Sequence, residues 1–213
     1  MANDAYKYYD VKIKGLSPLM MHNGQLANPL SKYAKAMKEF KGKKSEEDYA
    51  EMAEVEFNGG LYWAEGIGPY VPGESLDAMI KEGARKKKLG KVFESCVMSF
   101  RDDGDLRFPI IYDGPRDRVG LFATERFVDS RMVRVPPRTG ARVLRTRPVF
   151  DGWSLEFTLQ VSPCELNDTD IAEALQSASL YGGLMEYRPK YGRFLVESCE
   201  LRGEKKVAKK KAA

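Results

Sequence analysis

The sequence is poor in the residues that build metal centres, disulfide frameworks and membrane spans. It contains one histidine and three cysteines, Cys96, Cys164 and Cys199, which stand apart with no CxxC spacing. Isolated cysteines in odd number argue against a disulfide framework and against zinc, so we expect no metal and no cofactor. A run of about 18 apolar residues is also missing, which argues against a membrane-spanning helix.

The first residues and the known catalytic motifs point the same way. "MANDAYKYYD" lacks the cationic and apolar parts of a signal peptide, so we expect a cytoplasmic protein with no membrane partner. A Walker loop, a GxSxG elbow and an HExxH pair do not occur. The acidic "DDGD" at 102–105 lacks the remaining ligands of a cation loop and is interpreted as a turn. We therefore expect a binding protein rather than an enzyme.

Positive charge is gathered into a few segments, although the formal net charge is only +4. One stretch without acidic residues holds Arg131, Arg134, Arg138, Arg142, Arg145 and Arg147. A second group, Lys86, Lys87 and Lys88, ends an amphipathic segment, while acidic residues concentrate at 45–56. Such segregation indicates a face that binds a polyanion.

Hydrophobic periodicity predicts a mixed α+β chain. Strands are expected in "YKYYDVKIKG", "FPIIYDG", "WSLEFTLQV" and "GRFLVESCEL", and helices in "LSKYAKAMKEF", "SEEDYAEMAEVEF", "GESLDAMIKEGAR" and "NDTDIAEALQSASL". The first two of these helices form an insertion at 31–60, and a protruding Arg-rich hairpin occupies 131–148. Without these additions the order is strand, helix, strand, strand, helix, strand.

That order is the split βαβ, ferredoxin-like (RRM-like) pattern, an antiparallel sheet with two helices on one face. We expect a single domain over 1–203 and a basic disordered tail at 204–213. The other face of the sheet is left open, as in common modules that bind single-stranded RNA.

Three motifs carry a resemblance to a known family. "GLSPLMMHNG", "PYVPGESLDAMIKEGAR" and "LYGGLMEYRPKYGRFLV" together resemble the RAMP superfamily of CRISPR-associated proteins, particularly backbone subunits of effector complexes. The chain also has a more general similarity to phage-encoded proteins that carry stretches like its "SPLMMHN" and "RPKYGRF". The chain departs from the family pattern at Glu74, where the family usually has serine. The resemblance implies a subunit that coats single-stranded RNA repeatedly, as a homo-oligomer or filament or beside other effector subunits.

The glycine-rich stretch before the last strand supplies the first group of candidate binding residues. Its glycines let backbone approach a ligand, its cations suit phosphates and its tyrosines suit bases. These candidates are Tyr187, Arg188, Lys190, Tyr191 and Arg193. The hairpin arginines would follow phosphates, or alternatively pair with the acidic helix Glu46–Glu56.

His22 and Asn23 follow the first strand, where some family members place a proton-transfer group. His22 is therefore a candidate for catalysis, and a metal-independent endoribonuclease is an alternative function. A phage protein that binds or anneals single-stranded DNA is a second alternative. A third is an assembly protein whose arginines meet acidic partners.

Overall fold

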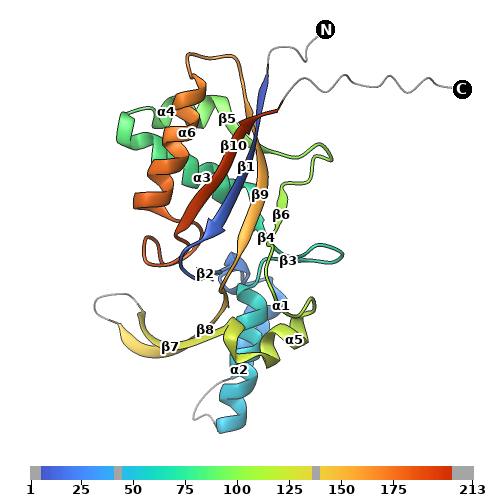
Figure 1. The fold of residues 1–213 in the computed structure, drawn as a ribbon. Coiled ribbons are helices and arrows are strands. Elements are labelled where there is room, and N and C mark those ends of the chain that lie inside the picture. Colours follow the sequence, from blue (N-terminus) through green and yellow to red (C-terminus); the bar gives the residue numbers. More distant parts are fainter. Residues whose placement is uncertain (1–5, 41–44, 136–139, 203–213) are drawn as a thin grey trace, which may run out of the picture.

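The structure of the protein is a computed structural model that describes residues 6–40, 45–135 and 140–202. Over these ranges the chain forms six α-helices and ten β-strands, a mixed α+β fold with three antiparallel sheets (Figure 1). No helix in the described ranges is long and apolar enough to cross a membrane. Arg138 and the expected tail at 204–213 lie outside the described residues.

The main sheet has four strands in the order β10-β1-β9-β5 (Figure 1). They are β1 (Lys7–Gly15), β5 (Val97–Phe100), β9 (Ser154–Val161) and β10 (Phe194–Leu201). In β1, Tyr9, Val11 and Ile13 are buried and alternate with exposed residues. This period of two places one face of the sheet on the core and leaves the other face open.

Helices α3 (Gly73–Ala84) and α6 (Asp168–Ser177) pack together and contact opposite edges of the main sheet, at β5 and β10. A Cβ added to Gly83 would lie 2.1 Å from the carbonyl oxygen of Ala174, so only glycine permits this close approach. Helix α4 (Gly90–Cys96) then leads into β5. The core on this side includes Trp153, which is fully buried and whose Nε1 donates to the carbonyl of Ser17 at 2.9 Å.

A second group of elements lies beyond the end of β1 (Figure 1). A three-stranded sheet in the order β2-β8-β7 is accompanied by three helices. These elements are β2 (Leu19–Met20), β7 (Val128–Val135), β8 (Ala141–Phe150), α1 (Lys32–Glu39), α2 (Glu46–Gly60) and α5 (Arg118–Ala123). Ser45 caps α2 in a capping box with Asp48, as its position before the acidic run predicts.

Along the chain, the second strand of the main sheet is β5 and not "FPIIYDG", as we expected. "FPIIYDG" contributes only the short β6 (Arg107–Pro109), which joins β3 (Trp63–Ala64) and β4 (Gly68–Pro72) in the third sheet. The position is taken by β5, whose four residues pair with β9. The proline before Ile110 explains part of the error, because proline cannot supply the amide that a ladder requires.

Short helical turns connect several of these elements. They are η1 (Gly24–Leu26), η2 (Arg85–Lys87), η3 (Glu125–Phe127) and the π-helical η4 (Ala178–Gly182).

Candidate nucleic-acid interface

The glycine-rich stretch forms a loop, residues 183–193, that connects η4 to β10 and lies against the segment after β1. The amide of Gly192 donates to the carbonyl of Pro18 at 2.8 Å, and that of Glu186 donates to Met20 at 3.1 Å. Gly192 has φ 68°, and a Cβ there would lie 1.9 Å from the carbonyl oxygen of Leu184. This loop therefore requires glycine at 192, and hydrogen bonds to the segment after β1 hold its backbone in place.

Two tyrosines of this loop meet the base of the β7–β8 hairpin. Tyr187 and Tyr191 pack edge to face, with ring centroids 6.1 Å apart. Arg131 of β7 donates to the hydroxyl of Tyr191 at 2.6 Å and lies 5.3 Å from the centre of that ring. Arg147 of β8 lies 4.9 Å from the centre of the Tyr187 ring and donates to its hydroxyl at 3.2 Å. We call Arg131, Arg147, Tyr187 and Tyr191 the arginine–tyrosine cluster.

Arg131 is the more constrained cation of the cluster. It forms a two-pronged ion pair with Asp129, two residues earlier on the same strand. The hydrogen bonds that Arg131 donates to Asp129 and Tyr191 raise its pKa above the usual range, so the group stays charged. Arg147 has no carboxylate partner among the described residues, and its Nε is buried without a hydrogen-bond partner there.

Arg145 is committed to the fold. Its guanidinium pairs with Glu56 of α2, whose side chain is only 5% exposed, and the second oxygen of Glu56 accepts from the amide of Thr146 at 2.8 Å. Of the two arrangements that the sequence left open for the hairpin arginines, Arg145 adopts the pairing with the acidic helix.

The hairpin arginines do not share one edge. Arg131 is opposite Arg145, and Arg134 is opposite Arg142. Because side chains alternate along a strand, the three-residue step from Arg131 to Arg134 places these two pairs on opposite faces. Arg134 and Arg142 are exposed, near the described end of the hairpin.

A small pocket adjoins the cluster and brings the three motifs together. Its volume is 210 Å³, and it is lined by His22, Tyr62, Glu74, Ser75, Ala78, Met185, Glu186 and Arg188. We call it the His22 pocket. The candidate binding residues expected from the sequence do not include Tyr62, Glu74 or Glu186, although both glutamates lie within the quoted motifs.

His22 is half-buried, and its Nδ1 is buried with no hydrogen-bond partner among the described residues. Burial lowers the pKa of His22 below 6.5, and the charge of Arg147 lowers it further, whereas Glu186 acts in the opposite sense. The imidazole is therefore neutral at pH 7. The side chain of the neighbouring Asn23 accepts from the amide of Gln25 at 3.3 Å and donates to the carbonyl of Leu61 at 3.4 Å.

The lysine group after α3 lies elsewhere in the structure, against α6 and η4. Lys87 pairs with Glu173 of α6, and Lys86 lies 4.6 Å from the centre of the Tyr181 ring in η4. Lys88, with φ 63°, ends the turn. Lys190 and Arg193 are exposed on the glycine-rich loop and at its end, and the backbone of Arg193 bonds to Leu16 and Ser17.

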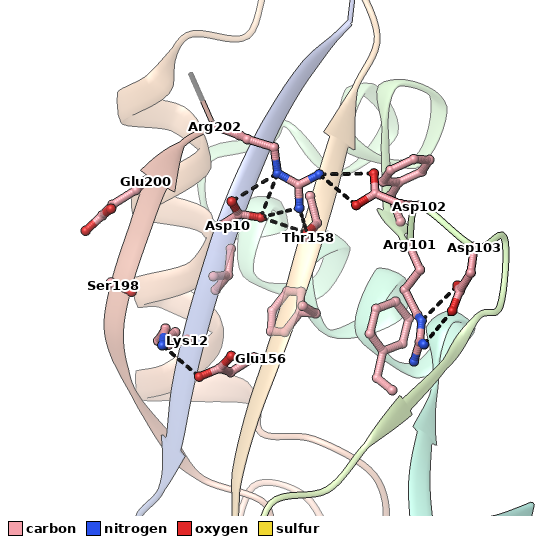
Figure 2. Close-up of a pocket in the computed structure, with 14 residues that line it drawn as sticks. Asp10, Lys12, Arg101, Asp102, Asp103, Glu156, Thr158, Ser198, Glu200 and Arg202 are labelled. Atoms are coloured by element: carbon pink, nitrogen blue, oxygen red, sulfur yellow. Dashed lines mark hydrogen bonds and ion pairs between the residues drawn. The ribbon is translucent and has the colours of Figure 1, made fainter. Parts of the chain in front are cut away.

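The open face of the main sheet carries a separate set of charges (Figure 2). A hollow of 610 Å³ there is lined by five carboxylate residues and three cations: Asp10, Asp102, Asp103, Glu156, Glu200, Lys12, Arg101 and Arg202. Lys12 pairs with Glu156 at 2.7 Å, and Arg101 pairs with Asp103 at 2.6 Å.

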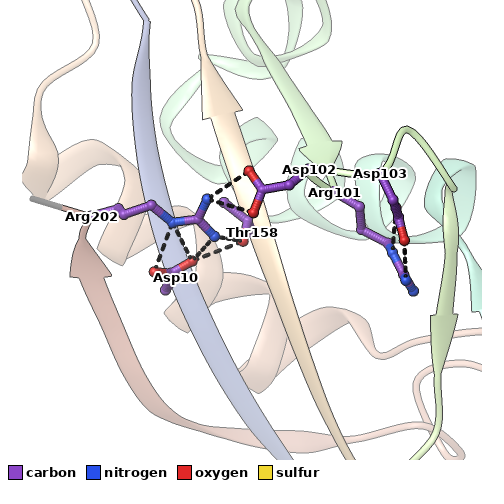
Figure 3. A network of polar contacts seen from close by, with 6 residues as sticks. All are labelled: Asp10, Arg101, Asp102, Asp103, Thr158 and Arg202. Carbon is purple, nitrogen blue, oxygen red and sulfur yellow. Dashed lines mark hydrogen bonds and ion pairs between the residues drawn. The ribbon is translucent and has the colours of Figure 1, made fainter. Parts of the chain in front are cut away.

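Arg202, directly after β10, connects two strands, β1 and β9, and a loop on this face (Figure 3). Its guanidinium donates to Asp10 at 2.6 Å, to Thr158 at 2.7 Å and to Asp102 at 3.3 Å. Since the cations are already paired and carboxylates outnumber them, this face offers a polyanion no excess positive charge. In this respect it differs from the open face that we expected.

The fold and these surfaces together define a class: a mixed α+β protein whose basic and aromatic side chains meet beside an Arg-containing hairpin. No family model and no curated protein sequence matches the chain. The chain is similar in structure to one in the cryo-EM structure of the Type III-B Cmr-beta bound to cognate target RNA, with a TM-score of 0.51 and 11% identity. The match covers 92% of this chain and 61% of that one, and at this identity it concerns the fold alone.

Proposed function

We propose that the protein binds single-stranded nucleic acid, RNA in preference to DNA, without cleaving it. The arginine–tyrosine cluster is the observation that carries this proposal. Guanidinium groups neutralise phosphates, while tyrosine faces stack on unpaired bases, and the two kinds of group alternate here within 6 Å of one another. Arg188, Lys190 and Arg193 extend the interface along the loop as exposed cations. Arg142, on the opposite face of the hairpin from Arg131, would extend it around the described end of the hairpin.

The fold supports the same proposal. The order β10-β1-β9-β5 with α3 and α6 on one face is the order of a ferredoxin-like sheet, so we assign the chain a RAMP-like core. The likeness to a chain of Type III-B Cmr-beta, a CRISPR effector complex bound to RNA, is consistent with that assignment. From it we infer RNA as the strand, and a repeating subunit that coats it.

The decisive experiment measures the affinity of a fluorescent single-stranded RNA by anisotropy. Tyr187→Ala removes a stacking face and should weaken binding about tenfold, because one base–aromatic stack contributes about 1–3 kcal/mol. Tyr49→Ala is the matched control, since Tyr49 is an exposed tyrosine of α2 outside the interface. Equal affinities of the wild type and both variants would overturn the proposed site.

A DNA strand of the same sequence, used as competitor, separates RNA binding from the activity of a single-strand DNA-binding or annealing protein. Stronger competition by DNA than by RNA would favour the latter. Sedimentation of the protein with and without RNA tests the repeating subunit: oligomers that form equally well in nuclease-treated protein would favour an assembly role that needs no nucleic acid.

A metal-independent endoribonuclease is the second candidate, and the His22 pocket is the observation that favours it. A neutral imidazole is the form that accepts a proton, and His22 is in this form at pH 7. Incubation of end-labelled RNA in EDTA with the wild type and with His22→Ala decides the matter. Cleavage by the wild type alone would establish the enzyme, and RNA left intact by both would remove it.

A further inference from the structure

The His22 pocket contains carboxylates where a phosphate-binding surface should have none. Glu74, in the first turn of α3, and Glu186, in the glycine-rich loop, both line it. Neither glutamate forms an ion pair with any described residue. A carboxylate beside a nucleic-acid strand repels phosphates, so its presence there needs a different partner.

The donors of a nucleobase are the partners that fit. A carboxylate has two oxygens that accept hydrogen bonds side by side. Guanine alone among the bases presents two adjacent donors on its pairing edge, the N1–H and the N2 amino group, whereas uracil presents one donor between two acceptors. Arg188, which also lines the pocket, suits the O6 and N7 acceptors of guanine.

The remaining lining suits one flat ring. Tyr62 is half-buried and packs edge to face against Tyr70, with centroids 5.9 Å apart, so its ring is held in place. The 210 Å³ volume lies below the range of pockets for drug-sized ligands and is suited to a single base. The unpartnered Nδ1 of His22 supplies one further polar contact.

The pocket is also placed where a bound strand would reach it. Glu186 and Arg188 flank Tyr187 of the arginine–tyrosine cluster in sequence, and the charge of Arg147 acts on His22. A strand whose phosphates lie on Arg147 and whose base stacks on Tyr187 would therefore present a neighbouring base at the pocket mouth. Recognition of single strands commonly uses bases splayed out in this way.

We propose that the His22 pocket takes one unpaired guanine of the bound strand, with Glu186 accepting from the N1–H and N2 amino group of its pairing edge and Arg188 donating to the adjoining O6 and N7. This inference rests on the proposed function, because it assigns base preference to the same interface.

The test compares anisotropy titrations of uridine oligomers that carry one central guanosine, inosine, adenosine or uridine. Guanosine should bind roughly tenfold more tightly than uridine, as a good two-bond contact to a base provides. Inosine lacks the N2 amino group and should fall between them. Glu186→Gln should abolish the guanosine preference, since an amide presents a donor to a donor, while leaving the uridine oligomer's affinity within about twofold.

Glu197→Gln is the matched control, because Glu197 is an exposed glutamate of β10 outside the pocket. Equal, salt-sensitive affinities for all four oligomers would overturn the guanine pocket and leave the proposed function standing. Absence of binding by every oligomer would overturn the proposed function itself. A Glu186→Gln variant that weakens all four equally would show that Glu186 only positions the loop, which also overturns the inference.

Discussion

Glu56 is nearly buried and holds Arg145 and the backbone of β8 in place at the base of the hairpin. Glu56→Gln should lower the free energy of unfolding by about 2 kcal/mol, because it removes the charged partner of Arg145 from a low-dielectric site. The larger loss of stability that follows from breaking a fully buried ion pair does not apply, because the Arg145 side chain is 35% exposed. Urea unfolding followed by circular dichroism measures the change.

Glu54→Gln provides the matched comparison, because Glu54 is an exposed glutamate two residues earlier on α2. We expect it to change stability by less than about 0.5 kcal/mol. If both variants unfold at the same urea concentration as the wild type, the pair with Arg145 contributes nothing to holding β8.

His22 gives the stability a pH dependence whose sign can be worked out. Its folded-state pKa is lowered, first by burial and then by Arg147, so the unfolded chain binds the proton more readily. Stability is therefore fully present above the unfolded pKa of about 6.5 and falls as the pH drops below it towards the folded value. Because the chain has one histidine, a single residue accounts for this titration.

His22→Gln should flatten the unfolding free energy between about pH 7 and 5.5, whereas the wild type loses stability over that interval. Urea titrations at the two pH values measure both slopes. A variant that retains the wild-type slope would show that the imidazole is equally solvated in both states.

Among the elements, the β7–β8 hairpin combines a structural cost with the binding role that we propose for it. Arg134 and Arg142 are directly opposite each other, and like charges in that position destabilise a strand pair. Arg142→Glu removes one of the two like charges and should raise the free energy of unfolding by up to about 0.5 kcal/mol. The same change should weaken RNA binding, since it reverses a charge on the proposed interface.

The two readouts therefore move in opposite directions, which separates binding from folding. Thermal unfolding measures stability, and anisotropy at several salt concentrations measures RNA binding, where the log–log slope should become shallower by about 0.7. An Arg142→Glu protein that binds RNA with the wild-type slope would exclude this end of the hairpin from the interface.

The elements also show what the sequence can predict. The strand at 7–15 and the helix that begins at Gly73 follow from local periodicity, and the helix after Ser45 also follows from its capping box; all three are present. Strand β5 has four residues and no turn signal before it, so local pattern could not distinguish it from the end of α4.

The candidate site, like the fold, could be predicted only in part from the sequence. Residue types and motif positions identified the tyrosines and arginines as candidates, but not which of them meet. The contact between Arg131 and Tyr191 joins residues 60 apart, and that between Arg145 and Glu56 joins residues 89 apart. Such pairings depend on strand register and on how α2 packs against β8, and neither is encoded in a local period.

At the scale of the whole molecule, the charges are distributed unequally between two surfaces. On the open sheet face, Lys12, Arg101 and Arg202 are each paired with carboxylates (Figures 2 and 3). At the hairpin base, Arg147 instead packs on a tyrosine. The mild net charge of +4 therefore hides one surface that is self-neutralised and another that is available to an anion.

This unequal distribution of charge predicts which cations determine the salt dependence of RNA binding. If three or four phosphates are neutralised at the hairpin and loop, the affinity for single-stranded RNA should fall with a log–log slope of about −2 to −3. Arg147→Ala should make that slope shallower by about 0.7, the share of one phosphate on a single strand. Lys12→Ala removes a cation of the same charge from the open sheet face and should leave the slope unchanged, because Lys12 is already paired with Glu156.

Anisotropy titrations at four or more salt concentrations compare the three proteins. A slope that responds to Lys12 and not to Arg147 would move the interface to the open face of the sheet, where the family of RRM-like modules binds RNA, and would reverse the assignment made from the arginine–tyrosine cluster.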